Sequence, residues 1–119
     1  MRTKELGRFG EERAARYLRL RGYRILETNY ACRFGEIDLI AQRGRYLVFV
    51  EVKLRKSADF AAAREFVTAA KRQRIRSTAA LYLSQNETAL QPRFDVIEIY
   101  APDGADGKVT INHIENAFE

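Results

Sequence analysis

The fold is decided by residues 35–53, whose sequence is GEIDLIAQRGRYLVFVEVK. Two segments rich in β-branched and aromatic residues, 35–41 and 46–53, flank a short stretch that contains Gly44. This pattern is typical of a β-hairpin. A turn symmetric about positions 43 and 44 predicts that Glu36 faces Glu51 and that Asp38 lies diagonally across from Glu51.

Side chains alternate along a strand, so Asp38, Glu51 and Lys53 are expected on one face of the hairpin. Diagonal neighbours have Cα atoms about 7–8 Å apart, and two carboxylates can close that distance around one hard divalent cation. We therefore expect Asp38 and Glu51 to bind Mg²⁺ or Mn²⁺, with the backbone carbonyl of Val52 as a further ligand. Lys53 would orient a water or stabilise the transition state of phosphodiester hydrolysis.

The alternative is that these charges form the solvated face of an ordinary hairpin. Two features count against it. The charged face also carries three apolar residues, Ile40, Leu47 and Phe49. The opposite face is apolar throughout and carries Ile37, Leu39, Tyr46, Val48, Val50 and Val52. Charges in a sheet covered on both sides are costly unless they are paired or bind a metal.

Periodicity on either side of the hairpin predicts the remaining elements. Residues 3–21 are expected to form a helix ended by Gly22, and residues 23–30 a strand. A second helix is expected to open at 57–60 and to run to about residue 83, followed by strands at 93–100 and 109–114. The order is α-β-β-β-α-β-β, and residues 1–119 form a single domain of the α/β class.

The first helix places two neighbouring glutamates differently. On a helical wheel Glu11 lies at the edge of the apolar stripe, next to Leu18, while Glu12 lies among arginines. Glu11 is therefore expected to reach the metal site as a further carboxylate, and Glu12 is expected to face solvent.

The second helix carries Lys71 on an apolar stripe that also includes Val67, Ile75, Thr78 and Tyr82. A core-facing lysine usually needs an anionic partner. Two interpretations are open for Lys71. Its ammonium pairs with the site carboxylates or with DNA phosphate, or its aliphatic stem simply extends so that the ammonium reaches water.

The charge of the chain favours a polyanionic partner. The 119 residues carry a net charge of +5, and 16 of the 21 cationic residues are arginine, whose planar fork grips phosphate. Residues 1–93 hold 20 Lys and Arg against 10 Asp and Glu, whereas residues 94–119 hold one against six. Nucleic-acid contacts are expected from residues beyond the hairpin and on the second helix: Arg55, Lys56, Lys71, Arg72 and Arg74. A plain solvated surface is the alternative reading.

The sequence excludes several classes of protein. Cys32 is the only cysteine, so an internal disulfide is impossible and a reducing compartment fits. No apolar run approaches the roughly 18 residues needed to span a bilayer, and residues 1–5 lack the apolar core of a signal peptide. We expect a cytoplasmic protein with no membrane partner.

Four segments together carry a family resemblance: Gly35–Ile40, Val48–Arg55, Arg93–Ile97 and the ending Ala117-Phe118. The sequence resembles the YraN-like family of uncharacterised bacterial proteins, a family similar in turn to restriction-endonuclease-like nucleases and archaeal Holliday-junction resolvases. The resemblance implies a restriction-endonuclease-like fold, a mixed β-sheet flanked by helices, with a magnesium-dependent site.

Carried over by position, the resemblance makes Asp38 and Glu51 the metal-binding acids and Lys53 the catalytic lysine. Glu11 matches the glutamate of the first helix, although Glu12 doubles it in this sequence.

The primary hypothesis is a metal-dependent nuclease that hydrolyses phosphodiester bonds of structured DNA, such as a junction or a flap. Cutting a four-way junction symmetrically calls for two sites, which a homodimer would present. The alternative is a non-catalytic module that binds nucleic acid or a partner on a nuclease scaffold. A third hypothesis is an enzyme directed at RNA or a ribosome-associated factor.

Overall fold

The hairpin lies at the centre of the sheet in the computed structural model, which describes residues 3–55 and 67–119. The elements along the chain are α1 (Thr3–Leu20), β1 (Arg24–Cys32), β2 (Gly35–Arg43), β3 (Tyr46–Arg55), α2 (Ala69–Gln85), β4 (Gln91–Tyr100), the short 3₁₀ helix η2 (Gly104–Asp106) and β5 (Thr110–Phe118). Apart from η2, this is the predicted order α-β-β-β-α-β-β.

The five strands form one mixed sheet in the order β1-β2-β3-β4-β5. β3 and β4 pair in parallel, and the other neighbours pair antiparallel. Parallel neighbours need a crossover connection, and α2 lies within the one that joins β3 to β4. The predicted α/β architecture is confirmed.

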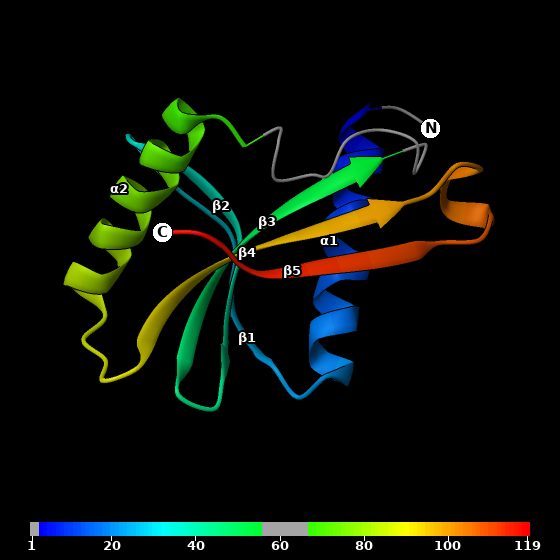
Figure 1. Ribbon diagram of the computed structural model, residues 1–119. Helices are drawn as coiled ribbons and strands as arrows, with labels where there is room; N and C mark the ends of the chain where they lie inside the picture. The colour runs from blue at the N-terminus through cyan, green and yellow to red at the C-terminus, as the bar shows by residue number, and fades with distance from the viewer. Residues whose placement is uncertain (1–2, 56–66) are drawn as a thin grey trace.

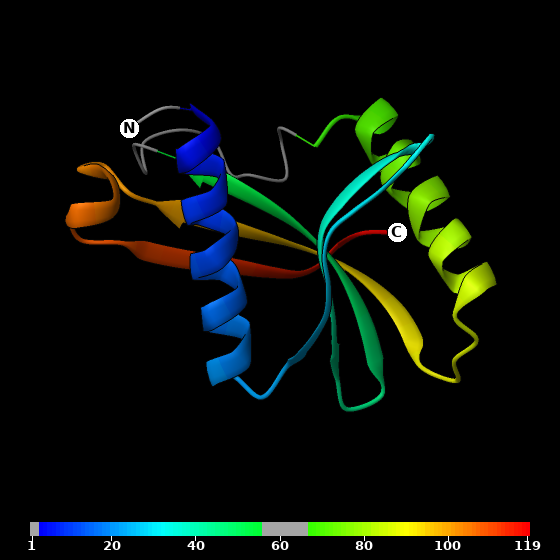
Figure 2. The same ribbon diagram turned by 180° about the vertical axis from the view of Figure 1, so that it is seen from behind.

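The helices cover opposite faces of the sheet, so the molecule has three layers (Figures 1 and 2). Beneath α1, Ala14 and Leu18 pack in one apolar cluster with Leu39, Val48 and other sheet residues. Beneath α2, a second cluster includes Phe49, Ile75 and Tyr82. The expectation that both faces of the hairpin are covered is therefore confirmed, and a charge on the inner strands has little water to face.

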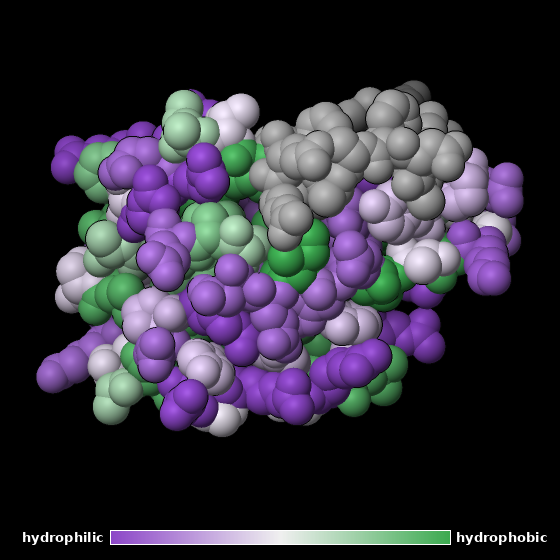
Figure 3. Space-filling model, viewed as in Figure 1, coloured by the Kyte–Doolittle hydropathy of each residue, from purple (hydrophilic) through white to green (hydrophobic). Residues whose placement is uncertain are grey.

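The outer surface is mostly polar. Figure 3 shows hydrophilic side chains over much of one face, with smaller hydrophobic groups between them. Among the described residues, Leu20 and Phe34 are the large hydrophobic side chains that are exposed. No helix in the described ranges has the length and apolarity to cross a membrane.

The register of the central hairpin differs from the prediction. Arg43 pairs with Tyr46 and Leu39 with Val50, so the turn consists of Gly44 and Arg45 alone. Gly44 has a φ of 57°, which glycine adopts without steric cost in such a tight turn. The pairing is shifted by two positions, so a ladder continued beyond Leu39 would bring Asp38, not Glu36, opposite Glu51. A shift of two does not by itself move a side chain to the other face.

β2 also departs from simple alternation near its start. Ile37 packs in the cluster beneath α2, whereas Leu39 packs in the cluster beneath α1. The prediction that the two share a face is wrong. On β1, Thr28 pairs with Leu39 and Tyr30 with Ile37, and Asn29 between them has a φ of 51°, so the backbone beside Asp38 is not extended.

α1 ends as the sequence predicts. Gly22 takes a φ of 88°, and the N–H groups of Gly22 and Tyr23 donate to the carbonyls of Arg19 and Leu18. These bonds satisfy carbonyls that the helix itself leaves open. Glycine is needed here because a side chain disfavours that φ.

α2 begins later than expected. Its first residue is Ala69, and the side chain of Thr68 caps it by accepting a 3.1 Å hydrogen bond from the N–H of Lys71. Val67 precedes the helix and is nevertheless buried. The predicted opening at 57–60 falls outside the described residues, but a cap at Thr68 shows that no helix runs through this position. Ile75, Thr78 and Tyr82 form the predicted buried face.

Candidate functional site

Asp38 lies where the pairing of β2 with β3 ends. The ladder runs from Arg43 to Leu39 on β2, and beyond it the N–H of Val52 donates a 2.8 Å hydrogen bond to Oδ2 of Asp38. In a continued ladder Val52 would come opposite Ile37 instead. The carboxylate of Asp38 therefore accepts the hydrogen bond that the backbone carbonyl of Ile37 would accept in a continued ladder. This bond fixes Asp38 against β3, the strand that carries Glu51 and Lys53.

The same bond orients the backbone of Val52. In an antiparallel ladder the N–H and C=O of one residue point toward the same neighbouring strand. Since the N–H of Val52 points to Asp38, its carbonyl lies on that side of β3 as well. The role of this carbonyl as a metal ligand stays a prediction.

Glu51 is held by two lysines. It is only 7% exposed, and its Oε1 lies 3.5 Å from Nζ of Lys53 and 2.6 Å from Nζ of Lys71. Lys53 follows two positions along β3, while Lys71 comes from the first turn of α2. The structure thus brings Glu51 and Lys53 together as expected, and it pairs Lys71 with a site carboxylate, one of the two outcomes left open.

Asp38, Glu51 and Lys71 line a cavity of about 180 Å³ between β2, β3 and α2. Its walls are formed by Gly35, Glu36, Asp38, Glu51, Lys71, Arg74 and Ile75. The position of Lys71 depends on Thr68, a residue that the sequence reasoning missed. Its signal was a threonine directly before a helical run, the usual N-cap.

Electrostatics set Asp38 apart from an ordinary aspartate. Burial and the neighbouring charges of Glu51 and Glu11 raise its pKa to about 7, although the Val52 hydrogen bond and Lys71 oppose the shift. Burial, together with the nearby Lys71, lowers the pKa of Lys53. The net effect on Lys71 is a raised pKa, because its contact with Glu51 outweighs desolvation. Titratable groups perturbed in this way are typical of functional sites.

The donor set suits a hard divalent cation that keeps some of its waters. It offers oxygens of Asp38 and Glu51 and the carbonyl of Val52, and Mg²⁺ is usually bound through one or two carboxylates with the rest of its shell left to water or phosphate. Within the described ranges, no three His, Cys, Asp or Glu side chains stand close enough to form a complete protein cage. The two carboxylates and the carbonyl are the oxygens that this site could offer to Mg²⁺ or Mn²⁺.

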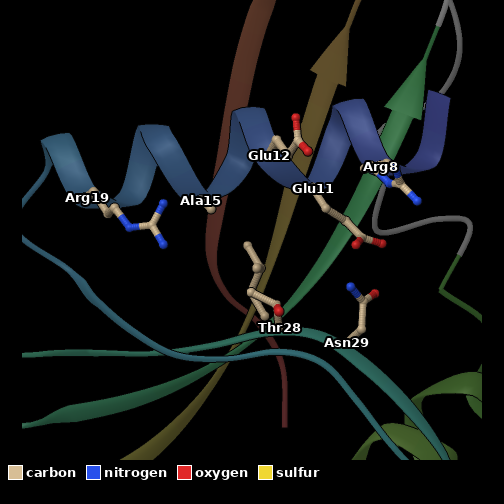
Figure 4. Close-up of a pocket in the computed structure, with 8 residues that line it drawn as sticks. Arg8, Glu11, Glu12, Ala15, Arg19, Thr28 and Asn29 are labelled. Atoms are coloured by element: carbon tan, nitrogen blue, oxygen red, sulfur yellow. The ribbon is translucent and has the colours of Figure 1, made fainter. Parts of the chain in front are cut away.

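Glu11 lies on the other side of Asp38. It is partly buried and Glu12 is exposed, as the wheel predicts. Glu11 lines a cavity of about 270 Å³ between α1 and β1, together with Arg8, Glu12, Ala15, Arg19, Thr28, Asn29 and Leu39. Figure 4 shows its carboxylate extending from α1 toward Asn29. It is near enough to raise the pKa of Asp38, but it does not line the cavity that holds Glu51.

The predicted nucleic-acid contacts are placed unevenly. Arg74 is exposed and lines the cavity of Asp38, and Arg72 is partly buried on α2. Arg55 ends β3, with Nε and Nη2 of its guanidinium buried. Lys56 lies outside the described residues.

Comparison with known proteins gives one consistent family. The family model described as "Uncharacterised protein family UPF0102" matches residues 10–99. A UPF0102 protein of Caldanaerobacter subterraneus subsp. tengcongensis is 47% identical over 116 residues, which cover 97% of this chain and 95% of the relative. One from Syntrophomonas wolfei is 46% identical over 117 residues, covering 98% and 99%.

Proposed function

The chain belongs to the uncharacterised protein family UPF0102, as its YraN-like sequence predicts, and on this basis and the geometry of its site we propose that it is a metal-dependent nuclease acting on structured DNA. One observation carries the proposal: the half-buried Asp38 and the buried Glu51 lie beside Lys53 at the point where two strands separate. The family's description names no activity, so the proposal rests on these residues.

Each residue of the proposed site has a distinct role in this chemistry. Asp38 is held by the N–H of Val52, and Glu51 is held by two ammonium groups, so both offer oxygens in fixed positions. Together with the carbonyl of Val52 they would hold Mg²⁺ or Mn²⁺. A divalent cation bound there supplies positive charge to a phosphodiester and acidifies a water.

Lys53 is suited to act on the reacting phosphate. Its ammonium lies 3.5 Å from Glu51 with a side chain 20% exposed, so it can donate a hydrogen bond to a non-bridging phosphate oxygen. The lowered pKa also makes Nζ readier to release a proton than an ordinary lysine. Lys71 and Arg74, at the wall of the same cavity, would bind a neighbouring phosphate.

The test is cleavage of a labelled four-way junction, a flap and a single strand by purified protein with Mg²⁺ or Mn²⁺. Asp38→Asn, Glu51→Gln and Lys53→Met should each reduce cleavage at least about a thousandfold, the usual effect of removing a central catalytic group. Glu27→Gln, on exposed β1, removes one acid and should cleave normally. Circular dichroism must show that each variant is folded.

A paired comparison on α1 tests the role of Glu11. Glu11→Gln should lower cleavage, and the neighbouring Glu12→Gln should not, because Glu11 alone is directed toward the sheet beside Asp38. Equal effects of the two variants would remove Glu11 from the proposed site. No cleavage of any substrate, DNA or RNA, with either ion would contradict the nuclease proposal itself.

One observation favours a second candidate, a nucleic-acid-binding or partner-binding module that does not cleave. Two lysines and two carboxylates balance one another in the site, and Lys71 contacts Glu51 at 2.6 Å. Such a site is neutralised by the chain itself. Salt-dependent DNA binding that Asp38→Asn leaves unchanged, without any cleaved product, would support this candidate.

A further inference from the structure

A second polar cavity lies at the other end of the hairpin. It has a volume of about 300 Å³ and is lined by Tyr23, Arg43, Gly44, Arg45, Tyr46, Arg93 and Glu115. Tyr23 and Tyr46 pack in the apolar cluster beneath α1, whereas Glu51 lies on the α2 side. Five positions along β3 separate Tyr46 from Glu51, roughly 16 Å at the usual rise of a strand. We call this cavity the arginine pocket.

Arg93 forms the fixed base of the arginine pocket. Its Nε and Nη2 donate to the two oxygens of Asp95 at 2.9 and 2.8 Å, and Nη2 also donates to the hydroxyl of Tyr23 at 2.8 Å. Asp95 is fully buried, and it also contacts His113 Nε2 at 2.7 Å and accepts from the N–H of Asn116 at 3.0 Å. The guanidinium of Arg93 therefore has one orientation.

One edge of that guanidinium is left for a ligand. Within the described ranges, Nη1 of Arg93 donates no hydrogen bond, and the guanidinium carbon lies 4.8 Å from the ring centre of Tyr46. The sequence reasoning missed this network, although its signal is visible: Asp95 interrupts an apolar strand, and Arg93 stands two positions earlier on the same face.

Arg43 and Arg45 form the outer wall, on either side of Gly44. The guanidinium carbon of Arg43 lies 5.3 Å from the ring centre of Tyr23, and that of Arg45 lies 5.1 Å from the ring centre of Tyr46. Arg45 also donates a 3.0 Å hydrogen bond to the hydroxyl of Tyr46. Contacts with ring faces hold exposed arginines in place and lower the entropy lost when they bind.

The charge of these two arginines is not neutralised within the part of the chain that the structure describes. Neither Arg43 nor Arg45 is within ion-pair distance of a carboxylate there. Glu115 is the one acid of the lining; its side chain is 57% exposed and lies 3.9 Å from Arg93. Among the described residues, the arginine pocket thus presents the guanidinium groups of Arg43 and Arg45 without an ion pair, in the same cavity as Arg93.

We propose that the arginine pocket binds a phosphate group of a nucleic-acid strand, at a position separate from the cleavage site. Planar guanidinium forks match the oxygens of phosphate and bind it bidentately. The outer faces of Arg43 and Arg45 are exposed, so an adjacent base can stack on them. This inference goes beyond the proposed function, because binding here needs neither a metal nor cleavage.

The test measures binding of a fluorescent DNA oligonucleotide by anisotropy, in EDTA, over a series of salt concentrations. Arg43→Gln with Arg45→Gln should weaken binding about tenfold and reduce the salt slope by about one, the loss of one phosphate contact. The matched control is Arg16→Gln with Arg24→Gln, two exposed arginines outside the pocket. The control should stay within about twofold of the parent protein.

Two further arms sharpen the result. Arg43→Lys with Arg45→Lys keeps the positive charge but removes the planar guanidinium groups, so this variant should bind the oligonucleotide nearly as weakly as the Gln variant. Inorganic phosphate and a nucleoside monophosphate, followed by NMR shifts of the same arginines, separate a strand from a free phosphate compound. Strand binding that depends on the pocket supports the proposal. Equal losses in pocket and control variants, full rescue by lysine, or binding of the small compounds alone would overturn it.

Discussion

The N–H of Val52 donates its hydrogen bond to the side chain of Asp38, not to a backbone carbonyl of β2. This exchange marks the place where the two central strands part. It fixes the carboxylate next to Glu51, and it leaves the carbonyl of Val52 on the same side of β3. The proposed metal site is therefore built from a defect in the ladder, a position where active-site residues are often directed.

Asp38→Asn should stabilise the protein at neutral and alkaline pH when no divalent ion is present. The folded state raises the pKa of Asp38 from 3.8 to about 7. Between these pH values the folded protein binds a proton that the unfolded chain has lost, so stability falls as pH rises and the full cost is present above about pH 7. Thermal unfolding in EDTA at pH 8 should show a rise of roughly 5 °C in the variant.

The pH dependence of the difference in Tm between Asp38→Asn and the parent protein serves as the control. The gain from Asp38→Asn should shrink as pH falls through about 7 toward 4, and added Mg²⁺ should reduce it at pH 8 by stabilising the parent protein. A gain that is the same at every pH would show that the charge of Asp38 is not its cause.

Lys71→Met should weaken the metal-free protein and strengthen its response to Mg²⁺. The ammonium lies 2.6 Å from Glu51 and competes with any other cation for that carboxylate. A tenfold gain in Mg²⁺ affinity would add roughly 5 °C to the Mg²⁺-dependent rise in Tm. Lys108→Met removes an exposed lysine and should leave the Mg²⁺ response unchanged. If both variants respond like the parent, Lys71 does not compete with the ion.

Asp95→Asn should destabilise the protein by about 3 kcal/mol at pH 7, because it leaves Arg93, whose side chain is only 12% exposed, without its counter-charge. Hydrogen bonds from His113 and Arg93 lower the pKa of Asp95 despite its burial. Its contribution is thus present above its ordinary pKa of 3.8 and is lost as pH falls through the lower folded value. Urea unfolding from pH 7 to pH 3 should show the gap closing. Glu115→Gln, at the exposed rim, should cost little by comparison.

Thr68→Ala should cost about 1 kcal/mol, since it removes the cap of α2. The loss loosens the first turn, which carries Lys71. Amide exchange should therefore quicken from Ala69 to Arg72 and remain slow near Ala79. An unchanged exchange rate in the first turn would mean that the hydroxyl does not hold the helix start.

Much of the site could be predicted without any structure. Glu51 and Lys53 share a face because strand side chains alternate, and this property survives the two-position error in the register. Asp38 lines the same cavity as Glu51, although alternation fails between Ile37 and Leu39. The difference between Glu11 and Glu12 followed from helical periodicity in the same way. Local geometry of one element is enough for both conclusions.

Other features could not be predicted because they depend on contacts between distant parts of the chain. The pairing of Lys71 with Glu51 joins α2 to β3, and the arginine pocket joins the hairpin turn to Tyr23 and to β4. The late start of α2 depends on the hydroxyl of Thr68. It accepts the hydrogen bond of the Lys71 N–H, which a preceding helical turn would otherwise accept through a backbone carbonyl.

The sequence alone thus determined which elements form, their order and the faces on which Glu11, Glu51 and Lys53 lie, since these follow from periodicities of 3.6 and 2.0 residues along one segment. Only the tertiary structure decided which charges meet, which are buried and how far their pKa values move. These properties depend on how α1 and α2 pack against a particular register of strands. A displacement of a few ångströms is enough to separate a carboxylate from its cationic partner.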